Sequence, residues 1–101
     1  MVPRLSRSEA LKLLRECFET GIVEYHPHFA QRCRERGIDL LDAQYVLRKG
    51  VICDEAELDV RFQEWRYKVE GKPPDGERLK VVIAFLERDE VLVITVMLNK
   101  K

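Results

Sequence analysis

The chain has 101 residues, 46% of them hydrophobic, and its 18 basic and 18 acidic side chains give a formal net charge of zero. This composition favours one folded domain, excludes a largely disordered chain, and argues against a protein that coats nucleic acid through bulk charge. No apolar run reaches the ~20 residues of a membrane span and no secretory leader is visible, so we expect a cytoplasmic protein without membrane contact.

The first predicted element is a helix over residues 7 to 19. Ser6 and Glu9 have the spacing of a capping box, and apolar side chains then recur at helical intervals. Gly21 follows the last of them, as expected for a glycine that ends a helix. Residues 1 to 21 therefore form an N-terminal amphipathic helix with a structural role.

A helical region is predicted over residues 22 to 50. It begins with a short β-prone segment at 22 to 25, suited to an edge strand. Two helices should follow, because Gly37 ends the first and Asp39 is a suitable N-cap for the second, which stops at Gly50. We expect these helices to form a hairpin with a tight link.

Residues 51 to 98 predict an antiparallel sheet, with strands at 51–53, 60–70, 79–86 and 91–98. Within 60–70 the alternation places Phe62, Arg66 and Lys68 on the face opposite Tyr67. The acidic segment at 54–59 is expected to be a solvated connection. Helices followed by strands predict an α+β fold in a single domain over residues 1 to 101, with N-terminal helices packed on three to four antiparallel strands.

The cysteines do not indicate a disulfide framework. Cys17, Cys33 and Cys53 are scattered and odd in number, and no CxxC occurs, which is typical of a reducing compartment. His26 and His28 with Cys33 lack a second ligand cluster. We therefore predict no metal site and no cofactor.

The basic ridge of residues 28 to 36 suggests an anion site. On a helix, His28, Arg32 and Arg36 follow one another at four-residue intervals beside an apolar stripe that contains Phe29 and Cys33. Two arginines at this spacing repel each other by a few tenths of a kcal/mol. An anion such as a phosphate would remove the conflict.

Four segments carry a family resemblance when taken in order: HFAQRCRERGI (28–38), RYKVEG (66–71), GERL (76–79) and VITV (93–96). Together they resemble the domain-of-unknown-function family 4258, which is grouped with RelE-like toxins in the barnase, EndoU, colicin and RelE superfamily of metal-independent ribonucleases. The resemblance covers roughly residues 25 to 98. Cys33 departs from it, because a larger apolar residue, usually Met, is expected there. The resemblance implies a toxin-like endoribonuclease with a cognate antitoxin protein as partner.

Metal-free RNA cleavage requires a base, an acid and cations near the phosphate, and four residues are predicted to be catalytic. His28 is the expected base or acid. Arg32 and Arg66 are expected to clamp the phosphate, because the guanidinium fork matches phosphate oxygens. Thr95, a hydroxyl in an otherwise apolar strand, can bond the phosphate or orient His28.

Three further residues are predicted to bind substrate. Arg36 lies about 12 Å from His28 along a helix, which favours contact with a flanking nucleotide. Tyr67 can stack on a base or donate a proton, and Lys68 adds a positive charge beside it. RNA, and not DNA, is the expected nucleic acid.

Two non-catalytic interpretations remain open at this point: a non-enzymatic interaction module of the same fold, and a degenerate toxin that binds its partner but does not cut. In both, the cations serve structure. The ridge would pair with Glu35, Asp39 or Asp42, and the strand cations would pair with Glu64 or Glu70.

Overall fold

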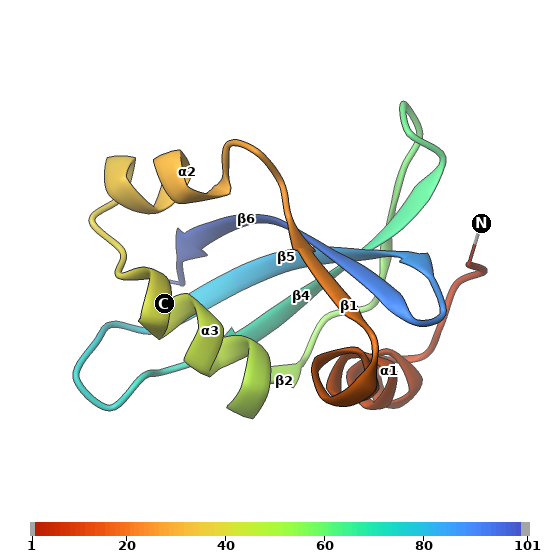
Figure 1. Ribbon diagram of the computed structural model, residues 1–101, viewed down its shortest axis with the longest axis horizontal. Helices are drawn as coiled ribbons and strands as arrows, with labels where there is room; N and C mark the ends of the chain where they lie inside the picture. Colours follow the sequence, from red (N-terminus) through yellow and green to blue (C-terminus); the bar gives the residue numbers. More distant parts are fainter. Residues whose placement is uncertain (1, 100–101) are drawn as a thin grey trace.

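The computed structural model describes residues 2 to 99 (Figure 1). Within this range, three helices and six strands follow one another as α1 Arg7–Thr20, β1 Ile22–Tyr25, α2 Phe29–Glu35, α3 Leu40–Lys49, β2 Val51–Ile52, β3 Glu57–Asp59, β4 Glu64–Gly71, β5 Leu79–Glu87 and β6 Glu90–Leu98. The predicted α+β class is confirmed. No helix in this range is long and apolar enough to cross a membrane.

Helix α1 has the two ends that its sequence predicts. The Ser6 Oγ accepts a bond from the Glu9 N–H at 3.2 Å, and the Glu9 carboxylate accepts one from the Ser6 N–H at 2.9 Å. At the other end, the Gly21 N–H donates to the Cys17 carbonyl at 3.1 Å. A Cβ at Gly21 would clash with the carbonyl oxygen of Asp89, so the close approach to the turn between β5 and β6 requires glycine.

Helices α2 and α3 are consecutive but pack on different strands. His28 and Arg36 flank α2 as its cap residues, and Gly37 then turns the chain with a left-handed φ of 66°. Asp39 caps α3 by accepting a bond from the Leu41 N–H at 2.8 Å. Helix α2 contacts β6, whereas α3 contacts β4 and β5. The end of α2 is therefore next to the last strand.

The strands form one mixed sheet in the order β1–β6–β5–β4–β2, with β3 also paired to β4. Strands β4, β5 and β6 are antiparallel neighbours, but β1 runs parallel to β6, with Ile22 opposite Glu90. Within residues 2 to 99 the sheet thus has six strands and one parallel pair, and not the expected three or four antiparallel strands. Strands β1 and β2 lie at the segments 22 to 25 and 51 to 53, where short strands were expected. Strand β3 was not expected, because its three residues are too few for a clear alternation.

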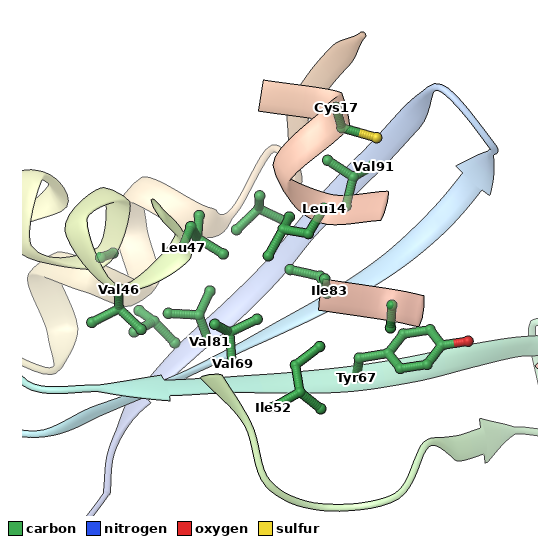
Figure 2. Packing of buried hydrophobic residues seen from close by; sticks show 14 of the residues in the cluster. Leu14, Cys17, Val46, Leu47, Ile52, Tyr67, Val69, Val81, Ile83 and Val91 are labelled. Atoms are coloured by element: carbon green, nitrogen blue, oxygen red, sulfur yellow. The ribbon is translucent and has the colours of Figure 1, made fainter. Parts of the chain in front are cut away.

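One face of this sheet holds the core (Figure 2). Leu14 of α1 and Leu47 of α3 point toward apolar residues of the central strands. These strand residues include Val69, Val81, Ile83 and Val91. Side chains at the alternate strand positions lie on the opposite face. We call this opposite side the groove face; it bears Arg66, Lys68, Val82, Leu92, Ile94, Thr95 and Met97.

A β-bulge in β6 places two successive side chains on the groove face. As β5 advances from Val82 to Ile83, the partner on β6 shifts from Thr95 to Val93, so Ile94 has no partner. Val93 is fully buried in the core. Ile94 and Thr95 both line hollows on the groove face.

Candidate active site on the groove face

The groove face carries two hollows that share Arg66. The larger, which we call the groove, has a volume of about 320 Å³ and is lined by Glu57, Leu58, Asp59, Arg66, Lys68, Val82, Thr95 and Met97. The smaller, which we call the side pocket, has a volume of about 140 Å³ and is lined by His26, Phe62, Glu64, Arg66, Leu92 and Ile94. The predicted site residues Arg66, Lys68 and Thr95 therefore line one groove.

One row of paired residues, which crosses the sheet from β4 to β6, has a cation at each end. Lys68 on β4 pairs with Val82 on β5, which pairs with Thr95 on β6. Beyond Thr95, the Arg36 Nη1 donates to the Thr95 Oγ1 at 3.2 Å and to the Val96 carbonyl at 3.0 Å. Adjacent strands lie ~5 Å apart, so β4 and β6 are about 10 Å apart. The long side chains of Arg36 and Lys68 can approach one anion from both sides.

Arg36 bonds neutral acceptors and not carboxylates. None of the ion pairs within residues 2 to 99 includes Arg36 or Arg32. Glu35 instead accepts a bond from the Gln31 side chain at 3.0 Å, and Asp39 caps α3. The alternative in which Arg32 and Arg36 pair with Glu35, Asp39 or Asp42 is therefore not realised among the described residues.

Carboxylates face the other groove cations. The Asp59 Oδ2 lies 3.2 Å from the Arg66 Nη2, and the Glu64 Oε2 lies 3.5 Å from the Arg66 Nε. Glu57 pairs with Lys68, and its hydrogen bond raises the pKa of Lys68. The acidic segment expected to be a solvated connection thus contains strand β3, which brings negative charge to the groove.

Removing one of these carboxylates should strengthen anion binding. In Glu57→Gln the Lys68 ammonium keeps its charge but loses its ionic partner, so we expect affinity for an RNA oligonucleotide to rise by up to about fivefold, as for a partly exposed pair worth ~1 kcal/mol. Fluorescence anisotropy at low salt measures this. Glu55→Gln is the matched control, because Glu55 pairs with Arg4 and Arg7 and lines neither hollow. An equal rise in both variants would show that net charge alone matters.

The two histidines lie next to each other at the start of α2. His28 is exposed, makes no capping bond, and has its ring centre 5.5 Å from that of His26. The His26 N–H donates to the Val93 carbonyl at 2.8 Å, which continues the β1–β6 pairing by one residue. His26 thereby reaches the side pocket beside Arg66. Sequence reasoning missed this residue, although strand alternation continued past β1 would have placed it on the face opposite Tyr25.

Tyr67 and Arg32 do not line the groove. Tyr67 is 2% exposed on the core face, and its hydroxyl accepts a bond from the Leu5 N–H at 2.9 Å. Burial raises the pKa of the Tyr67 phenol. Arg32 is exposed on α2, and its side chain has neither an ion pair nor a hydrogen bond within residues 2 to 99. Arg66, Lys68 and Thr95 line the groove, and Arg36 reaches its edge through the bond to Thr95. Like Arg36, the residues His28, Arg32 and Tyr67 line neither hollow, and no such bond among the described residues connects them to the groove.

The thiols lie away from this site. Cys17 and Cys33 are buried, and burial raises the pKa of both thiols. Cys53 is exposed but lines neither hollow. Among residues 2 to 99, no group of three or more His, Cys, Asp or Glu side chains is arranged to hold a metal ion.

Comparison with known proteins identifies one family. The model described as Domain of unknown function (DUF4258) matches residues 25 to 98. This stretch runs from the end of β1 through β6, so it contains every residue of both hollows and leaves α1 outside. The family predicted from the four sequence segments is confirmed. No curated protein and no solved structure is significantly similar to the chain.

Proposed function

The chain belongs to the DUF4258 family, and we propose that it is a metal-independent endoribonuclease of the RelE-like type, the toxin of a toxin–antitoxin pair. The scissile phosphate would bind in the groove. The observation that carries the proposal is the row that ends in Lys68 on one side and in Arg36, bonded to Thr95, on the other. Arg66 adds a second guanidinium from the neighbouring row, and guanidinium forks match phosphate oxygens.

The proposed reaction is an internal transfer at phosphorus. A general base removes the 2′-hydroxyl proton, the 2′ oxygen bonds to phosphorus, and the bond to the 5′ oxygen breaks as a general acid protonates that oxygen. Negative charge grows on the non-bridging oxygens, where Arg36, Arg66 and Lys68 would stabilise it. The Thr95 hydroxyl accepts from Arg36, so its own O–H is free to donate to the phosphate.

His26 and His28 are the proposed acid–base pair. The His26 Nδ1 accepts a bond from the His28 N–H at 3.2 Å, which leaves Nε2 to carry the proton of the neutral ring. His26 lines the side pocket that shares Arg66 with the groove. The exposed ring of His28 lies beside it. The sequence predicts this role for His28, and we add His26 because it lines the side pocket.

An RNA-cleavage assay tests the proposal through Arg36, on an oligonucleotide in EDTA and on translating ribosomes in their Mg²⁺ buffer. We expect the wild type to cut and Arg36→Ala to be slower by about 10²-fold, because one donor to the developing charge is lost. Arg34→Ala is the control, since Arg34 is also an exposed arginine but makes neither of the bonds by which Arg36 reaches Thr95 and Val96. Thermal melts check that both variants fold. Cleavage abolished by the chelator, or equal losses in both variants, would contradict the proposal.

The toxin role brings further expectations, which rest on the family resemblance. The partner is a cognate antitoxin protein, and the nucleic acid that binds directly is RNA and not DNA. The proposed location is the cytoplasm, where the RNA substrate is made.

An interaction module that does not cut RNA, including a degenerate toxin, is the second candidate. The ion pairs of Glu57 with Lys68 and of Asp59 with Arg66 favour it, because they already neutralise two of the groove cations. This candidate predicts no cleavage by the wild type on either substrate, and none by Glu57→Gln.

A further inference from the structure

We propose that the side pocket is a nucleobase subsite, in which Phe62 stacks on a base of the RNA next to the scissile phosphate; this inference rests on the proposed function. The pocket volume of about 140 Å³ is several times the ~30 Å³ that one water molecule occupies in the liquid. The pocket is therefore large enough for a ligand of several heavy atoms, such as a ring.

The walls of the side pocket suit an aromatic ligand. Phe62 is 61% exposed, and the half-buried apolar side chains of Leu92 and Ile94 lie on the same pocket. When a second flat ring covers an aromatic ring that was exposed to water, the free energy falls. Stacking of this kind accepts every base, because all bases have a π-face.

The backbone holds Phe62 in place before any ligand binds. The Asp59 Oδ1 accepts bonds from the N–H groups of Arg61 at 3.0 Å and of Phe62 at 3.3 Å. The Gln63 side chain donates to the Val60 carbonyl at 2.8 Å. Figure 1 shows this loop between β3 and β4 projecting beyond the body of the sheet. A loop fixed in this way loses less conformational entropy on binding.

Arg66 connects the subsite to the phosphate. Its guanidinium carbon lies 5.8 Å from the Phe62 ring centre, and its side chain lines both hollows. A phosphate bound by Arg66 would therefore have its neighbouring base close to Phe62. The exposed Val60 on the same loop lines neither hollow. Phe62, and not Val60, is therefore the apolar side chain of this loop that lies beside Arg66 and can reach the base next to a bound phosphate.

A double-mutant cycle tests the subsite without cleavage. The probe is a fluorescent 2′-O-methyl RNA pentanucleotide, whose blocked hydroxyl cannot attack phosphorus, together with versions that each lack one base. We expect Phe62→Ala to lower affinity for the complete probe by about 10-fold. Phe62→Trp should retain the affinity, and Val60→Ala is the control. For one abasic probe, wild type and Phe62→Ala should bind equally, because the contact is already missing.

The other outcomes are distinguishable. If the wild type binds the complete probe and Phe62→Ala binds it equally well, the subsite is wrong while the proposed function stands. If, in addition, the wild-type protein self-associates and both Phe62→Ala and Val60→Ala weaken that self-association, the loop between β3 and β4 is a protein contact. If the wild type binds no probe, the subsite is also wrong, and the cleavage assay with Arg36→Ala separately decides the proposed function.

Discussion

Alanine in place of His26 or of His28 is expected to slow RNA cleavage by about 10³-fold, because each ring would supply one of the two proton transfers. The rings lie 5.5 Å apart, with His26 in the side pocket and His28 exposed beside it. Initial rates of the wild type and of both variants at one pH, with EDTA present, measure this.

Gln31→Ala serves as the control for the histidine variants, since Gln31 is an exposed residue of α2 that lines neither hollow. Loss of activity in His26→Ala alone would assign the chemistry to the residue in the pocket and remove His28 from it. Full activity in both single variants would exclude histidine acid–base catalysis, whatever the groove binds.

Leu14→Ala is expected to lower the free energy of unfolding by about 3 kcal/mol, the loss typical of a leucine truncated in a rigid core. Leu14 on α1 is fully buried and packs with the apolar side chains of α3 and the sheet (Figure 2). Helix α1 precedes the residues that match the family model. A loss of this size would show that α1 unfolds together with the family domain. Urea unfolding followed by circular dichroism gives the value.

Lys12→Ala on the exposed side of the same helix should change the free energy of unfolding by less than about 0.5 kcal/mol. Because alanine is a good helix former, this control also shows that helix propensity is not what Leu14→Ala alters. A separate, early unfolding step for α1, or a loss for Leu14→Ala below about 1 kcal/mol, would mean that α1 is only loosely attached.

The helices and the long strands could be predicted because their signals are local. Helix α1 has a capping box at one end and a glycine at the other, and β4, β5 and β6 each have eight or nine residues of strand pattern. Strand β3 has the sequence Glu-Leu-Asp, which has little strand propensity. It is held by pairing with β4 and by the ion pairs of Asp59 with Arg66 and of Glu57 with Lys68. Such cross-strand contacts leave no trace in the local pattern of β3 itself.

The site was only partly predictable for the same reason. Arg36, Arg66, Lys68 and Thr95 could be selected from the family segments, but their position around one groove depends on the unpaired Ile94 of β6, which spacing does not reveal. His26 was considered only as a metal ligand. Phe62 was expected in a strand over 60–70, on the same face as Arg66. It does line the side pocket with Arg66, but β4 begins only at Glu64, and Phe62 lies in a turn that Asp59 holds.

The parallel pairing of β1 with β6 has a consequence for the order of assembly. It joins the first strand to the last, so this edge can close only after the whole intervening chain has been made and folded back. Contacts between such distant segments form slowly, because a long loop must be closed first. Thr95 and the anchor of His26 both belong to β6. A nascent or truncated chain without β6 would therefore lack the groove as well as the core residues Val91, Val93 and Val96. Any activity of the groove would begin only when folding is complete.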